Sequence, residues 1–330
     1  MVLGKKGREG LNMSISFQIL LEEERIIRGD FFPSANLTRG ILIICHGFKG
    51  FKDWGMFPYA ARKIAQEVDV VTFNFSYNGV GENLTEFTEL EKFAHNTYTR
   101  ELEDINSVVT LFSNHEDVKN TLLDQQSAGR GEPVVFHSCE SGLHAPVAGS
   151  SSLPLFLLGH SRGGGVSIIY ALDHGTEIAG VISWNGITNV DLFSPKIKEE
   201  MRTKGRSSVQ NARTRQELPL DVEILHDMER NKERFDIYSR IRDIQVPLLL
   251  IQGTKDALHL REGSERLVKL NRAVNWVQIE EGNHTFNTVH PFKGTTKPLE
   301  KAIDETLAFI RKKLEDWKIQ AKSESKTDTG

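Results

Sequence analysis

Short apolar runs alternate with segments of helical period along most of this chain, and this alternation restricts the fold more than any other feature of the sequence. The runs are apolar at consecutive positions and rich in β-branched residues, as in strands covered on both faces. They lie at residues 41–45, 70–75, 154–158, 178–184, 247–251 and 274–279. Between them, apolar residues recur with helical spacing at 61–68, 102–112, 166–172 and 299–317. The alternation predicts an α/β fold: a mostly parallel, twisted sheet with helices on both faces and right-handed crossovers.

Two segments extend this pattern into a domain organisation. Residues 14–32 have the pattern of an antiparallel hairpin added at one edge of the sheet. Residues 191–242 are highly charged, but their apolar residues, from Leu218 to Phe235, recur at near-helical intervals. We therefore expect a core made of residues 14–190 and 243–320, with 191–242 inserted as a small helical cap.

Three further segments do not fit the alternation. Residues 125–152 are dense in Gly and Ser, which favours an exposed hairpin or an irregular excursion over a functional site. Residues 321–330 are small and polar, and predict a disordered tail. Residues 1–13 are interpreted as a leader or a disordered start, with Met13 as an alternative first residue.

Composition argues against several classes of protein. The 41 Lys and Arg against 45 Asp and Glu give a net charge of -4 without a basic stripe, so nucleic acid is not an expected partner. The longest apolar runs are far shorter than the roughly 18 residues of a membrane-spanning helix. With only two cysteines, a disulfide scaffold is excluded, and the cytoplasm is the default location. The sequence does not set the oligomeric state and is compatible with a homo-oligomer.

The sharpest chemical signal is the segment Gly159-His160-Ser161-Arg162-Gly163-Gly164, which follows one predicted strand and precedes one predicted helix. A serine on a sharp turn between strand and helix exposes its Oγ above the sheet, and glycines beside it let the turn pack closely. The backbone N–H of Arg162, at the start of the helix, would point to an oxygen bound beside Ser161. The alternative is a plain glycine turn with a capping serine.

Together with other segments, this motif resembles the alpha/beta hydrolase superfamily over residues 41–310. The similarity is closest to the dienelactone-hydrolase-like, cinnamoyl-esterase-like and serine-aminopeptidase-like branches. It is carried by segments 46–50, 78–81, 159–164, 253–256 and 282–286. The sequence departs from these branches in using serine where dienelactone hydrolases usually have cysteine, and in having arginine at 162 where many esterases have glutamine or methionine. These branches use no metal or organic cofactor, so the resemblance implies none here.

A serine hydroxyl needs a base and an orienting acid before it becomes a good nucleophile. His284 follows the strand at 274–279, where the superfamily keeps its histidine, and His290 is the alternative. Asp256 follows the strand at 247–251 and gives the chain order Ser161, Asp256, His284 that the fold requires. Asp191 is the alternative acid, although it also suits a helix N-cap.

The resemblance also implies an oxyanion hole, and the apolar side of the cap predicts a substrate pocket. The segment His46-Gly47-Phe48-Lys49-Gly50 is similar to the superfamily's oxyanion segment, so the N–H of Phe48 would join that of Arg162, with His46 bracing the loop. We expect His46, Tyr77, Trp184 and Asn185 to lie at the substrate pocket, as substrate-binding residues.

The sequence therefore predicts a serine hydrolase that cleaves a small-molecule carboxylic ester, with a short or aromatic acyl group, through an acyl-enzyme on Ser161. A peptidase or thioesterase with the same three residues remains an alternative, as does a hydrolase-fold binding protein that turns nothing over. A metal site at His137, Cys139 and His144 is disfavoured because their spacing matches no standard zinc framework.

Overall fold

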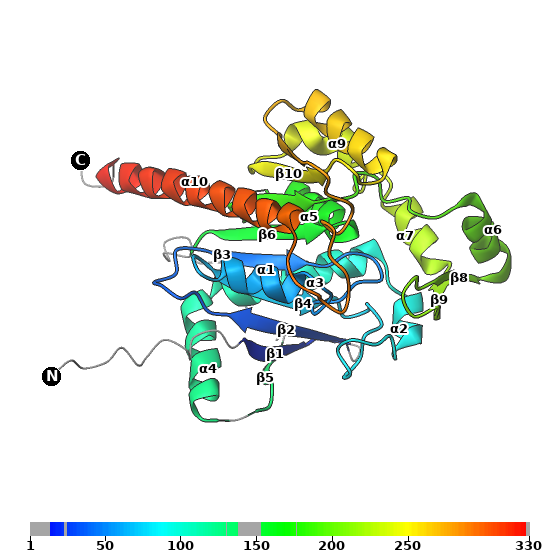
Figure 1. The fold of residues 1–330 in the computed structure, drawn as a ribbon, viewed down its shortest axis with the longest axis horizontal. Helices are drawn as coiled ribbons and strands as arrows, with labels where there is room; N and C mark the ends of the chain where they lie inside the picture. The colour runs from blue at the N-terminus through cyan, green and yellow to red at the C-terminus, as the bar shows by residue number, and fades with distance from the viewer. Residues whose placement is uncertain (1–13, 23–24, 130, 138–152, 176, 328–330) are drawn as a thin grey trace.

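The computed structural model describes residues 14–22, 25–129, 131–137, 153–175 and 177–327, which form a large sheet flanked by helices (Figure 1). Nine strands make up this sheet in the order β11-β10-β7-β6-β3-β4-β2-β1-β5. Their bounds are β1 (Ile15–Leu20), β2 (Ile26–Phe32), β3 (Ile41–Cys45), β4 (Asp69–Asn74), β5 (Val134–His137), β6 (Leu155–His160), β7 (Gly180–Trp184), β10 (Leu248–Gly253) and β11 (Asn275–Ile279).

The sheet is parallel across its centre, as the alternation of strands and helices predicts. The neighbours from β11 through β10, β7, β6 and β3 to β4 all pair in parallel. The N-terminal strands β1 and β2 form the expected antiparallel hairpin, and β2 pairs antiparallel with β4. The predicted fold class is thus confirmed.

Helices cover both faces, which explains why the central strands are apolar at consecutive positions. The described helices are α1 (Phe57–Ile64), α2 (Leu90–Ala94), α3 (Tyr98–Ser113), α4 (His115–Ser127), α5 (Arg162–His174), α6 (Pro195–Lys204), α7 (Glu223–Arg230), α8 (Ile237–Arg240), the 3-10 turn η1 (Ile241–Asp243), α9 (Leu258–Leu270) and α10 (Lys297–Thr327). In β3, Leu42 and Ile44 join a core cluster with α1 and α10, while Ile41 and Ile43 join a second cluster with α3 and α5. Successive side chains of a strand point to opposite faces, so each face receives its own apolar set.

The cap differs from the prediction. Residues 191–242 contain the helices α6, α7 and α8, but also a two-stranded antiparallel hairpin of β8 (Arg206–Gln210) and β9 (Glu217–Asp221). Leu218 and Leu220, which the helical interpretation placed on a helix, alternate with Pro219 on β9 and are buried on one side. Proline inside a helix would remove a backbone donor and clash with the preceding turn, so the strand is the better solution. Figure 1 shows this cap beyond one end of the sheet.

The segment at 125–152 and the tail also differ. The segment begins inside α4 and continues into β5, which pairs in parallel with β1 and forms the outer edge of the sheet, so the described part is neither a hairpin nor irregular. Residues 138–152 lie outside the described residues, as do 1–13, with the expected leader and the alternative start at Met13. Helix α10 continues to Thr327, so residues 321–327 are helical where a disordered tail was predicted.

Candidate active site

Ser161 lies between the end of β6 and the start of α5, at the carboxyl edge of the parallel strands. Its backbone has φ 56° and ψ -120°, a conformation that an L-residue adopts only under constraint. The constraint is visible in the bond from Ser161 N to Trp184 O on the neighbouring strand, at 3.0 Å. The strained turn therefore holds Ser161 at the point predicted from the sequence.

The loop after β3 packs directly against this turn. A Cβ added at Gly47 would lie 2.9 Å from Ser161 Cβ, and one at Gly163 would lie 2.4 Å from the carbonyl oxygens of Cys45 and His46. A side chain at either position would force the two segments apart, so both glycines are needed for the close approach. The structure thus brings Phe48 and its loop beside Ser161 and Arg162.

His284 and Asp256 complete a hydrogen-bonded chain with Ser161. His284 Nε2 lies 2.9 Å from Ser161 Oγ, and His284 Nδ1 lies 2.9 Å from Asp256 Oδ1. The Asp256 side chain is buried, whereas the His284 side chain is 39% exposed. In the neutral tautomer that suits both bonds, Nδ1–H donates to Asp256 and Nε2 accepts from the serine hydroxyl.

The two alternative residues lie elsewhere. His290 accepts a hydrogen bond from the Gly55 backbone through Nδ1 and contacts the rings of Phe51 and Trp54. Asp191 forms an ion pair with Lys198 in the cap, at 2.6 Å. Neither takes part in the chain of bonds at Ser161.

Two buried histidines flank the site in neutral form. Burial lowers the pKa of His46 to about 4, and its ring bonds the Gly47 carbonyl and the Phe75 backbone N–H. Burial likewise lowers the pKa of His160 to about 3, and its Nε2–H donates to the His284 carbonyl at 2.8 Å. Because both rings stay neutral, neither opposes a positive charge on His284.

The side chain of Arg162 forms a buried ion pair that the sequence did not reveal. Its Nε donates to Glu101 Oε2 at 2.9 Å, and both side chains are at most 5% exposed. The guanidinium carbon lies 4.0 Å from the ring centroid of Tyr98 and 5.5 Å from that of Phe48. Both terminal nitrogens lack a hydrogen-bond partner among the described residues. Arg162 therefore joins helix α3 to the ring of Phe48.

The residues predicted to bind substrate have other surroundings. Trp184 is fully buried and donates from Nε1 to Thr306 on α10, so it belongs to the core. Asn185 is also fully buried and bonds the backbone of Asn283 and His284. His46 is buried and braces its loop. The guanidinium carbon of Arg100 lies over the Tyr77 ring, 4.7 Å from the ring centroid. The prediction that Trp184 and Asn185 bind substrate is wrong, because a side chain without exposed surface cannot line a pocket.

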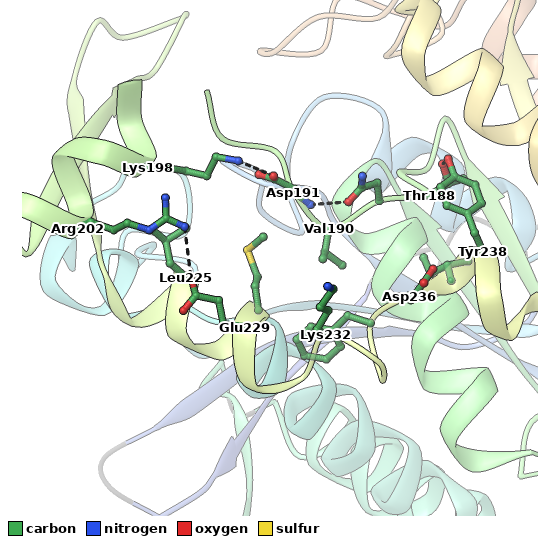
Figure 2. A pocket seen from close by; sticks show the side chains of 14 residues that line it. Thr188, Val190, Asp191, Lys198, Arg202, Leu225, Glu229, Lys232, Asp236 and Tyr238 are labelled. Atoms are coloured by element: carbon green, nitrogen blue, oxygen red, sulfur yellow. Dashed lines mark hydrogen bonds and ion pairs between the residues drawn. The ribbon is translucent and has the colours of Figure 1, made fainter. Parts of the chain in front are cut away.

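Two cavities lie near the carboxyl edge of the sheet. One, of about 400 Å³, is lined by residues 255–257, Leu260 and residues 283–285, and so includes His284 and Asp256. The other, of about 420 Å³, which we name the cap cavity, lies between residues 188–190 and the cap (Figure 2). Leu225, Met228 and Phe235 contribute apolar surface to the cap cavity, and ion pairs join Lys198 to Asp191 and Arg202 to Glu229 at its side.

The described residues contain neither a metal-binding cluster nor a membrane-spanning helix. In the part of the chain that the structure describes, no three His, Cys, Asp or Glu side chains gather as a metal site would require. Cys139 and His144 of the disfavoured metal cluster lie outside that part. Among the described helices, none combines the length and the apolar character needed to cross a bilayer.

Comparison with known proteins identifies the fold. Neither a protein-family model nor a curated protein matches the sequence. Among solved structures, the chain is similar to the monoglyceride lipase of Saccharomyces cerevisiae, with a TM-score of 0.60 and 15% identity, over 94% of this chain and 100% of that one. It is similar to Est1E from Butyrivibrio proteoclasticus, with a TM-score of 0.57 and 13% identity, over 92% and 100%. For the dienelactone hydrolase of Anabaena variabilis the values are 0.53 and 13%, over 90% and 96%. The chain thus has the alpha/beta hydrolase fold.

Proposed function

We propose that this protein is a serine hydrolase that cleaves carboxylic esters through an acyl-enzyme on Ser161. The observation that carries the proposal is the chain of bonds from Ser161 Oγ through the His284 ring to Asp256, with both distances at 2.9 Å. Nucleophile, base and orienting acid within hydrogen-bond reach are the geometric signature of such catalysis.

The first half-reaction forms the acyl-enzyme. Ser161 Oγ attacks the ester carbonyl carbon while its proton passes to His284 Nε2, and Asp256 stabilises the imidazolium. The negative charge on the carbonyl oxygen is held by the backbone N–H groups of Phe48 and Arg162. When the intermediate collapses, the bond to the alcohol oxygen breaks and His284 returns the proton to this leaving group.

The second half-reaction releases the acid. His284 takes a proton from water, whose oxygen attacks the acyl carbon, and the same two N–H groups hold the new oxyanion. Collapse breaks the bond to Ser161 Oγ, which regains its proton from His284. One ester and one water give one carboxylic acid and one alcohol, and the protein's own residues carry out every proton transfer.

We choose esters as the substrate class because of the names of the proteins with similar structures. Est1E is an esterase by its name and was solved with ferulic acid, an aromatic acid, and two of the other similar proteins are named as lipases of monoacylglycerols. The cap of this chain is small, which favours short or aromatic acyl groups over long chains. We place the substrate between the cap and the carboxyl edge of the sheet, with the cap cavity as its extension.

The experiment is hydrolysis of p-nitrophenyl esters graded by acyl size, with Ser161→Ala as the matched variant. We expect turnover of the short and aromatic esters by the wild-type protein and none above background by Ser161→Ala. Turnover of amides or thioesters in place of esters would reassign the protein to peptidases or thioesterases. A folded wild-type protein without activity on any of these would overturn the proposal.

A further inference from the structure

The second carboxylate oxygen of Asp256 is held by Gln252, a residue to which the mechanism above gives no part. Gln252 is 2% exposed near the end of β10, and its Nε2 donates to Asp256 Oδ2 at 2.5 Å. Asp256 Oδ1 accepts from the Ala257 backbone N–H at 2.7 Å and bonds His284. A carboxylate held at both oxygens cannot rotate, so the direction of its bond to His284 is fixed.

Ser264 sets which end of the Gln252 amide faces Asp256. Its Oγ, buried on α9, donates to Gln252 Oε1 at 2.8 Å. If the amide turned over, Oε1 would point at the carboxylate and its own partner would be lost. An amide oxygen and a carboxylate oxygen both lack a proton to share, so that arrangement is unfavourable. Ser264 thus keeps the donor end of Gln252 on Asp256.

Asn185 connects this amide to the loop that carries His284. Its Oδ1 accepts from Gln252 Nε2 at 3.1 Å and from the Gly253 backbone N–H at 2.7 Å. Its Nδ2 donates to the carbonyls of Asn283 and His284, at 3.2 and 2.9 Å. Asn185 has a positive φ of 48°, in the left-handed region that asparagine tolerates better than most residues. One side chain therefore ties the strand end before Asp256 to the backbone of the histidine.

We infer that Asn185, Gln252 and Ser264 form a positioning network that holds Asp256 and His284 in line with Ser161. The inference rests on the proposed function. It replaces the expected role of Asn185 in substrate binding with an internal one. Each member is at most 2% exposed, so none touches substrate; they act through the two groups that they orient.

The network makes a measurable demand, because small displacements at a reacting centre lower rates steeply. Removing the hydrogen-bond donor of Gln252 also leaves the negative charge of Asp256 less stabilised. Asp256 then stabilises a protonated His284 more strongly. The other charged and titratable groups that face this pair are His160 and Arg261, whose Nε donates to the Asp256 carbonyl, with the exposed Lys255–Glu281 pair alongside. These groups are the same in every variant of the test, so they do not account for a difference in pH profile between the variants.

The test compares Gln252→Met and Ser264→Ala with Thr306→Val, a matched control. Thr306 is a buried hydroxyl that bonds Trp184 on the opposite face of the sheet. We expect kcat on a short p-nitrophenyl ester to fall about 30-fold in Gln252→Met and about 10-fold in Ser264→Ala, with KM within about twofold. The acidic limb of the pH profile of kcat/KM should move up by about 0.5 pH units or more in Gln252→Met. Thr306→Val should lower Tm and leave kcat and the pH profile unchanged.

The outcomes separate the network from the proposed function. Suppose that the wild type is active and that Ser264→Ala and Gln252→Met, like the control, have a lower Tm but unchanged kcat and pH profile. This result would overturn the network and leave the proposed hydrolase function standing. A wild type that turns over no ester overturns the proposed function instead. If Gln252→Met does not fold, Ser264→Ala decides, because it deletes one oxygen and leaves the carboxylate and the histidine loop in place.

Discussion

The carboxyl edge of the sheet and the cap are built by different rules. At the sheet edge, Ser161 and Asp256 follow the fully buried strands β6 and β10, His284 follows the outermost strand β11, and their bonds to one another are partly buried. In the cap, ion pairs such as Arg202–Glu229 have both side chains more than half exposed, and short helices alternate with a hairpin. The sheet edge therefore depends on buried contacts between side chains, whereas the cap has ion pairs that water reaches. The predictions below test that division, from the largest expected effect to the smallest.

The first prediction compares the loss of an acidic side chain at the sheet edge, Asp256, with the loss of one in the cap, Asp191. Asp256→Asn should lower kcat by about 10⁴-fold, because the imidazole loses the partner that holds its useful tautomer. Asp191→Asn in the cap should change kcat less than about threefold, since it removes an exposed ion pair. Steady-state kinetics on one short ester measure both. Equal losses in the two variants would contradict the assignment of Asp256.

The second prediction concerns the ion pairs of the two regions. Glu101→Ala should lower the free energy of unfolding by about 3–5 kcal/mol, because it leaves the buried guanidinium of Arg162 without its counter-charge. Glu229→Ala should cost less than about 1 kcal/mol, since its partner Arg202 remains hydrated. Urea denaturation at pH 7 gives both values. A tolerated Glu101→Ala would show that the Arg162 side chain is not held as described.

The sequence predicted the sheet edge better than the cap and better than contacts between distant segments. Each of Ser161, Asp256 and His284 stands after a strand signal, so local pattern and the chain order of the resembled superfamily were enough to predict that these three side chains meet at the sheet edge. Arg162–Glu101 and the Asn185 network join distant segments, and no local signal encodes such contacts. Trp184 was misassigned because a strand covered on both faces does not reveal which face a side chain takes; alternation put it against α10. In the cap, Leu218 and Leu220 are two residues apart, a spacing that puts both on one side of a strand, and Pro219 between them disfavours the helix that was predicted.

The third prediction is a loss of stability in mild acid that comes from the sheet edge. Burial lowers the pKa of His46 to about 4 and of His160 to about 3 in the folded protein. Unfolded histidines bind protons below about pH 6.5, so the unfolded state binds more protons there and stability falls as pH falls. The free energy of unfolding should drop between pH 6.5 and 5, by at most about 1.4 kcal/mol per pH unit for each histidine. In His160→Gln the slope should be shallower, and a slope equal to that of the wild type would count against this reading.

The fourth prediction is the smallest and concerns the cap cavity. Met228→Trp places a bulky ring among its apolar lining residues. The ratio of kcat/KM for a naphthyl ester to that for the corresponding methyl ester should fall about tenfold, because about 1.4 kcal/mol of binding to the larger group is lost. Arg230→Trp, a change on the same helix but at a residue that does not line this cavity, is the control. An unchanged ratio in Met228→Trp would exclude the cap cavity as part of the substrate site.

The most direct measurement of the central claim is the mass and position of a covalent fluorophosphonate adduct. The phosphorus reagent reacts with a serine oxygen only when that oxygen is activated by a base, so labelling reports the nucleophile without assuming any substrate. Intact-mass spectrometry and peptide mapping should find one adduct, on Ser161, that is absent in Ser161→Ala and forms far more slowly in His284→Ala. An unlabelled wild-type protein, or an adduct that persists in Ser161→Ala, would contradict the account.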